Sequence, residues 1–176
     1  MARVKIKNIA NVRDIVKREF DKIRRDPQLL REIGKVTSEF LVKTSQTGKN
    51  PKTGEKYPRL SKSWVDQRDY LKRFNSIGGF FLDSRKSNVT FTGKLLSAVK
   101  KFTVEEGNAV VIFEPDGDHP GYKTASSRTK SVSFKKLLTY LADQGRVVLG
   151  INKTLEKRIN ILVRSFMRKK IIKSKF

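Results

Sequence analysis

The residues best suited to chemistry form a short acidic segment, Asp116-Gly117-Asp118-His119. It is the only part of the chain that looks like a metal-binding loop. A calcium loop needs further oxygen ligands at fixed spacing, and Pro120 interrupts the series. We therefore interpret the segment as a solvated acidic turn and expect no bound metal.

Three glutamates, Glu105, Glu106 and Glu114, raise a second hypothesis, a metal-dependent nuclease. Sites with two metal ions require little more than carboxylates on strand ends, so they leave little sequence signature. The spacing of these glutamates fits ordinary exposed strand ends equally well. A nuclease is therefore kept only as the third of three alternatives.

The chain has few of the residues that other kinds of catalysis require. The chain has no cysteine, which excludes a disulfide scaffold, a thiol nucleophile and cysteine-based zinc modules. His119 is its only histidine, and Gly78-Gly79 has neither the spacing nor the ending of a phosphate-binding loop. We expect no catalytic residue, no cofactor and no enzymatic activity.

The charge of the chain points instead to an anionic partner. Its 176 residues include 40 Lys and Arg against 17 Asp and Glu, a formal net charge of +23. Such an imbalance causes self-repulsion in the folded state, which nucleic acid, an anionic membrane or an acidic protein relieves. No zinc finger, basic zipper or aromatic RNA-binding strand is present, so any nucleic-acid contact is expected to be nonspecific and salt-sensitive.

The basic residues gather at both ends of the chain. Residues 1–25 hold nine Lys or Arg against three acids, and residues 153–176 hold nine against one. We expect contact with DNA or an acidic partner to involve Arg24, Arg25, Arg164, Arg168, Lys169, Lys170, Lys173 and Lys175.

The acidic residues suggest how identical subunits could meet. They lie close together in the sequence, at Glu105, Glu106, Glu114, Asp116 and Asp118. Acidic and basic surfaces on one chain suit head-to-tail contact between copies, which can close a ring. We expect these five residues to contact a neighbouring subunit.

Hydrophobic spacing predicts an α+β fold: a small antiparallel sheet with a β-hairpin, packed by N-terminal, middle and C-terminal helices. Residues 1–46 read as helix, interrupted where Asp26 can cap a second helix that starts at Pro27. The alternation after Phe102, a turn at Glu106-Gly107-Asn108 and the apolar run 109–113 predict the hairpin. We treat residues 1–176 as a single domain.

Shorter segments complete the expected order. Residues 48–58 indicate an exposed loop, Ser61 a helix cap, and 92–99 and 134–145 short helices. Residues 147–149 indicate a strand, and Asn152 can cap a terminal helix with the apolar stripe Leu155, Ile159, Leu162 and Phe166. We expect that helix to cover the sheet, and residues 114–130 to be mobile because they are rich in Gly, Ser and Lys.

The start of the chain gives no targeting signal. Residues 2–7, Ala-Arg-Val-Lys-Ile-Lys, alternate apolar with basic residues and precede no secretory apolar region. The longest apolar run, residues 109–113, is far shorter than the roughly 20 residues that span a bilayer. We expect a soluble protein that is made inside the cell and has no membrane partner.

Three segments, taken in order, resemble a known family. Residues 54–61 read Gly-Glu-Lys-Tyr-Pro-Arg-Leu-Ser, residues 92–97 Thr-Gly-Lys-Leu-Leu-Ser, and residues 146–152 Arg-Val-Val-Leu-Gly-Ile-Asn. They are similar to segments of the bacteriophage virion-morphogenesis or tail-completion family. The resemblance covers about residues 54–165, between the N-terminal helices (1–46) and a basic tail (166–176). Val147 stands where the family usually has proline, and its His-Gln-x-Gly element has only partial counterparts at 119–121 and 143–145.

This resemblance implies a structural virion protein of the head–tail interface, a neck or tail-completion subunit without catalysis. Such a subunit is made in the host cytoplasm and joins a homo-oligomeric ring that links connector and tail near the DNA channel. Its partners would be connector or neck proteins, tail-tube or tail-terminator proteins, and packaged DNA held without sequence preference. The second alternative is a nonspecific nucleic-acid-binding protein that acts alone.

Overall fold

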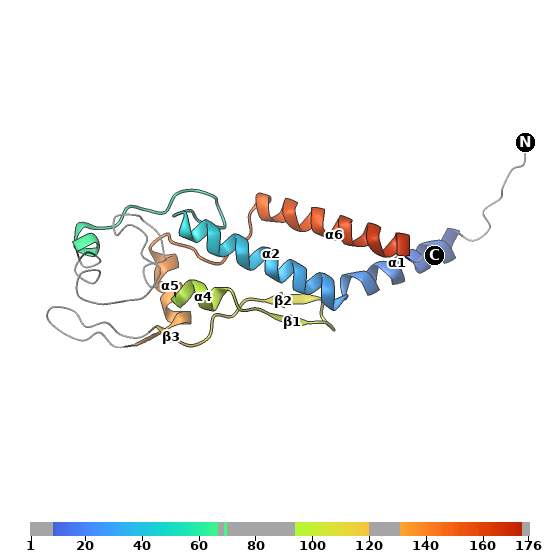
Figure 1. Ribbon diagram of the computed structural model, residues 1–176, viewed down its shortest axis with the longest axis horizontal. Helices are drawn as coiled ribbons and strands as arrows, with labels where there is room; N and C mark the ends of the chain where they lie inside the picture. The colour runs from blue at the N-terminus through green and yellow to red at the C-terminus, as the bar shows by residue number, and fades with distance from the viewer. Residues whose placement is uncertain (1–8, 67–68, 70–93, 120–130, 174–176) are drawn as a thin grey trace, which may run out of the picture.

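The computed structural model describes residues 9–66, 69, 94–119 and 131–173 (Figure 1). Within them the fold is α+β: mostly helical, with a small antiparallel hairpin packed with N-terminal and C-terminal helices. The molecule is elongated in Figure 1, and the start of the first helix and the end of the last helix lie toward the same end of it. The predictions for residues 92–93, for 120–130 and for Lys175 fall outside the described residues.

Two consecutive helices form the N-terminal part, α1 (Ile9–Arg24) and α2 (Pro27–Gln46). Asp26 separates them: its backbone is extended and its carboxylate accepts hydrogen bonds from the N–H groups of Gln28 and Leu29. Pro27 occupies the first turn, where its missing N–H leaves no helix bond unmade. The predicted boundary is confirmed, and so is the predicted end of α2 at Thr47.

Helix α2 is the central element of the fold. Its buried side chains contribute Phe40, Leu41 and Val42 to a core that also contains α4 (Lys94–Val99) and the start of α6 (Lys153–Lys173). The hairpin packs against α2, and α6 packs along the same helix. Figure 1 shows α2 between α6 and the hairpin, so the terminal helix is linked to the sheet through α2.

The predicted hairpin is present. Strand β1 (Thr103–Glu105) pairs antiparallel with β2 (Val110–Ile112), and Val104 stands opposite Val111. Ala109 closes the turn with a φ of 52°, a left-handed conformation that glycine or asparagine adopts more readily. Where the hairpin approaches α2, the helix has Gly34, and a Cβ there would overlap the ring of Phe102. The missing side chain thus permits close contact between helix and strand.

The terminal helix also begins as predicted. The Asn152 side chain accepts hydrogen bonds of 3.0 Å from the N–H groups of Thr154 and Leu155. Leu155 is fully buried in the core, and Arg158 lies over the ring of Phe40 at 5.7 Å from its centroid. These contacts fix the first turns of α6 to α2.

Two predictions were wrong. Residues 147–149 are buried around Val148 but form no strand, because they pair with no other strand among the described residues. The start of the segment expected to be mobile is instead ordered: β3 (Asp118–His119) pairs with β4 (Val132–Ser133). Ser133 then caps α5 (Phe134–Asp143) by accepting from the Lys136 N–H, and this second small sheet has no strong sequence signal.

The segment 48–58 is only partly the exposed loop that its composition indicates. Residues 52–56 are exposed, whereas Pro51 and Tyr57 are buried. A short antiparallel bridge between Lys49 and Lys56 closes the loop on itself. A new helix then starts after Ser61, whose hydroxyl accepts a hydrogen bond from the Trp64 N–H as predicted.

Candidate interaction surfaces

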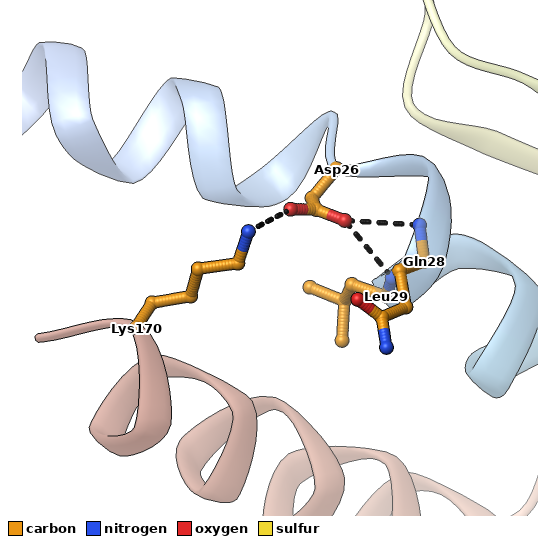
Figure 2. A network of polar contacts seen from close by, with 4 residues as sticks. All are labelled: Asp26, Gln28, Leu29 and Lys170. Carbon is orange, nitrogen blue, oxygen red and sulfur yellow. Dashed lines mark hydrogen bonds and ion pairs between the residues drawn. The ribbon is translucent and has the colours of Figure 1, made fainter. Parts of the chain in front are cut away.

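The two basic ends of the chain meet in space at the junction between α1 and α2. Lys170, near the end of α6, forms a 2.9 Å ion pair with Asp26 (Figure 2). Its ammonium group also lies over the ring of Phe166, 5.5 Å from the centroid. A residue from the C-terminal basic stretch is thereby held beside Arg24 and Arg25, which are adjacent to Asp26 in the chain and exposed.

Asp26 serves two structural roles with its two carboxylate oxygens. Oδ1 accepts hydrogen bonds from the N–H groups of Gln28 (2.9 Å) and Leu29 (3.4 Å), while Oδ2 contacts Lys170. Partial burial by itself would raise the pKa of Asp26. The hydrogen bonds from Lys170 and from the two backbone N–H groups outweigh it, so the pKa is lowered from its ordinary value.

The predicted contact residues divide into three groups. Arg24, Arg25, Arg164, Arg168 and Lys169 are exposed and available to a partner. Lys170 is exposed too, but its charge is engaged by Asp26. Lys173 is the last residue of α6 and its side chain is not described, while Lys175 lies outside the described part.

We call this region the basic end, defined by Arg24, Arg25, Arg164, Arg168 and Lys169. Residues 164–173 include five basic residues and no acidic one. Such a stretch on an exposed helix face favours contact with phosphates or with an acidic protein surface. The sequence predicted the residues, but it did not predict that the two ends would join at Asp26.

The five acidic residues predicted to contact a subunit are all exposed, but they do not form one patch. Glu105 and Glu106 stand at the hairpin turn, where Asn108 donates a 3.1 Å hydrogen bond to Glu105. Glu114 and Asp116 follow β2, and Asp118 begins β3, at the other end of the hairpin (Figure 1). A neighbouring subunit would therefore meet two separate acidic sites.

No group of three or more His, Cys, Asp or Glu residues suited to a metal ion was found within the part of the chain that the structure describes. In the segment expected to be an acidic turn, the Asp116 carboxylate accepts a 2.8 Å hydrogen bond from the N–H of Gly117. Within those same residues, no helix has the length and apolar character needed to cross a membrane.

A buried polar cluster was not predicted from the sequence. Arg146 is 8% exposed and donates hydrogen bonds to the carbonyl oxygens of Pro58 (3.2 Å) and Arg59 (3.3 Å) and to the Gln144 side chain (2.8 Å). Tyr57, 5% exposed, donates a 2.7 Å hydrogen bond to the carbonyl oxygen of Val147. The cluster joins the loop 48–59 to the segment 144–152.

Burial sets the electrostatics of this cluster. It lowers the pKa of Arg146, because desolvation disfavours the charged guanidinium, and the two neighbouring tyrosines offset only part of that effect. It raises the pKa of Tyr57 to about 12, despite the nearby hydroxyl of Ser45 at 3.3 Å. Tyr57 therefore stays a neutral hydrogen-bond donor at neutral pH, which suits a structural role.

One test addresses the junction at Asp26. We expect Asp26→Asn to lower the free energy of unfolding by no more than about 1 kcal/mol at pH 7, since asparagine still caps α2 and only a partly exposed ion pair is lost. Asp26→Ala should cost roughly 0.5–2 kcal/mol more because the cap is lost as well. Urea denaturation of the three proteins measures both steps.

The pH dependence of that difference has a defined sign. Because the folded state lowers the pKa of Asp26, the stabilisation is present above the ordinary value of 3.8 and is lost as the pH falls through the folded pKa. The gap between wild type and Asp26→Asn should therefore shrink below pH 3.8. A gap that stays constant down to pH 2 would show that the ion pair contributes nothing to stability.

Comparisons with known proteins add no relationship. No family model matches the chain, and neither a curated protein nor a solved structure is detectably similar to it.

Proposed function

We propose that the chain is a structural, non-enzymatic subunit of the bacteriophage head–tail interface, a neck or tail-completion protein that assembles into a ring near the DNA channel. The observation that carries the proposal is the basic end. Two cationic segments from opposite ends of the sequence are joined there by the Asp26–Lys170 pair, and Arg24, Arg25, Arg164, Arg168 and Lys169 are exposed. Such a surface binds DNA phosphates without sequence preference, or an acidic neighbour.

The buried cluster supports the proposal from another side. Two of the segments that carry the family resemblance, 54–61 and 146–152, contact each other through Tyr57 and Arg146. These two segments, far apart in the sequence, therefore form one structural unit. Such a unit fits a scaffold subunit, which would act in the virion after synthesis in the host cytoplasm.

DNA binding by the basic end is tested by neutralising Arg164, Arg168 and Lys169 to glutamine. We expect affinity for duplex DNA to fall, and the slope of log affinity against log salt to decrease by about 0.9 for each lost phosphate contact. The matched control replaces three exposed lysines elsewhere, Lys56, Lys135 and Lys136. Equal DNA affinity and equal assembly in the two triple variants would contradict a role for the basic end.

Assembly is tested with the same proteins. Light scattering on wild type, alone and with connector or tail proteins, should give the mass of a homo-oligomer, as a ring requires. Mass spectrometry should find the protein in purified virions. If neutralisation impairs assembly but leaves DNA affinity unchanged, the basic end binds an acidic neighbour instead. A monomer that binds DNA and is missing from virions would favour the alternative, a nucleic-acid-binding protein that acts alone.

A further inference from the structure

A groove runs between the hairpin and the first half of α2. It has a volume of about 580 Å³ and is lined by Arg31, Glu32 and Lys35 from the helix and by Phe102, Val104 and Glu106 on the strand side. The contact between Gly34 and Phe102 brings helix and strand together at the groove. Its apolar lining comes from Phe102 and Val104, and its charged residues are two basic and two acidic.

The groove lies on the β1 side of the hairpin, facing α2. Among the described residues, β1 pairs with β2 alone, so its other edge has no strand beside it. The lining includes residues of and next to β1 but none of β2. Unpaired N–H and C=O groups along a strand edge accept an added strand, whose side chains then occupy the adjacent groove.

The chain contains a segment whose pattern fits this site. Residues 2–7 alternate apolar Ala2, Val4 and Ile6 with basic Arg3, Lys5 and Lys7. A period of two places one set on each face of a strand, and in contact with β1 the segment would adopt this conformation in place of the helix expected for residues 1–46. Glu105 is an exposed acidic residue of β1 and does not line the groove, so a strand whose basic residues point outward meets it.

We propose that residues 2–7 of a second copy add to the open edge of β1 as a third strand. Val4 and Ile6 then enter the groove beside Phe102 and Val104, and the three basic residues lie outward, near Glu105. The N–H and C=O groups along the edge of β1 form the hydrogen bonds with the added strand. The alternation of apolar and basic residues makes residues 2–7 the segment that fits this edge.

The geometry favours a second copy over the chain's own segment. Helix α1 has 16 residues and so is about 24 Å long. It continues in the same general direction as α2, and its N-terminal end lies away from the hairpin (Figure 1). For residues 2–7 to reach β1 of their own chain, Asn8 alone would have to span the distance from the start of α1 back to the hairpin. One residue spans at most roughly 3.6 Å.

Each copy would thus donate one strand and accept another. The donating and accepting surfaces differ, so the contact is heterologous and generates a ring or a filament. This inference rests on the proposed function only in requiring several copies of the chain. The sequence alone suggested that an acidic surface joins neighbouring subunits. In the interface proposed here, backbone hydrogen bonds join them, and Glu105 and Glu106 have a secondary role.

A peptide titration tests the inference on the full-length chain. The receptor carries Val4→Asp and Ile6→Asp, so that its own segment is disabled and the β1 edge is free. The probe is a fluorescein-labelled peptide of residues 1–8, followed by anisotropy. We expect saturable binding, weakened at least about tenfold when Val4 and Ile6 of the peptide are both replaced by serine, because their apolar burial is lost.

Backbone methylation of the peptide distinguishes strand addition from simple charge attraction. Alternate N–H groups of a strand point to opposite edges, so only one edge can face β1. Methylating the nitrogens of residues 4 and 6 and methylating those of 3, 5 and 7 should have opposite outcomes, one abolishing binding and one sparing it. No binding, equal binding of both methylated peptides, or equal binding of a scrambled peptide overturns the proposal.

The mass of the assembly gives an independent readout. Val4→Asp with Ile6→Asp should reduce the oligomer seen by light scattering, whereas Thr53→Asp with Ser63→Asp, which adds the same charge at exposed positions, should not. A wild-type monomer, or equal oligomers in both variants, also overturns strand exchange. Since the titration contains neither DNA nor virion proteins, its failure leaves the DNA test of the basic end intact.

Discussion

Replacing Leu155 with alanine is expected to lower the free energy of unfolding by roughly 2–5 kcal/mol, the usual range for a fully buried leucine. Leu155 has no exposed surface and belongs to the same core cluster as Val99 and Val148. It lies in the first turn of α6, so the cavity left by alanine opens where α6 joins the core. Guanidinium denaturation followed by circular dichroism measures the change.

The matched control lies on the same helix. Ile161 is 68% exposed, and Ile161→Ala should change the free energy of unfolding by no more than about 0.5 kcal/mol. Leu162, part of the predicted apolar stripe, is only partly buried, so its replacement should have an intermediate effect. Equal losses at positions 155 and 161 would show that α6 does not pack on α2 as described.

The helix boundaries could be predicted from the sequence because their signals are local. Asp26-Pro27 and Asn152 use a side-chain oxygen to satisfy N–H groups two or three residues away, so the residue type alone indicates the geometry. The hairpin could be predicted for the same reason, since its two strands are separated by a short turn.

The role of residues 147–149 could not be predicted because it depends on distant partners. An apolar run of this length is consistent with a buried strand or with any other buried segment. In the structure the carbonyl oxygen of Val147 accepts a hydrogen bond from Tyr57, 90 residues earlier, and Val148 fills the core. The hydrogen bond satisfies the Val147 carbonyl oxygen and the core buries Val148, so the segment needs no neighbouring strand.

The candidate site was predictable in composition but not in arrangement. The basic segments at the two ends could be identified by counting charged residues, because this count needs no knowledge of the fold. The pairing of Lys170 with Asp26 needs the packing of α6 along α2, which no local pattern encodes. The acidic residues show the converse. They are close together in the sequence, but in the structure β2 and the segment after it separate them into two sites.

The second large effect is expected at Arg146. Arg146→Ala should lower the free energy of unfolding by roughly 2–4 kcal/mol, because hydrogen bonds to a charged group contribute about 1.5–3 kcal/mol each and relief of its desolvation offsets part of the loss. Arg146→Lys should recover less than half, since an ammonium lacks the planar fork whose Nη1 donates to Gln144 while its Nη2 donates to the carbonyl oxygens of Pro58 and Arg59. Arg59→Ala, which removes an exposed guanidinium next to the cluster, is the control.

A double-mutant cycle with Tyr57→Phe shows whether the cluster acts as one unit. Tyr57 and Arg146 hold the same two segments together, the loop 48–59 and residues 144–152, through separate hydrogen bonds. Once either residue is replaced, the segments are partly released and the other has less to hold. The combined loss should therefore be smaller than the sum of the single losses by about 0.5 kcal/mol or more. Strict additivity would mean that each residue fixes its own segment independently, and Arg146 would then be only a local anchor for the loop.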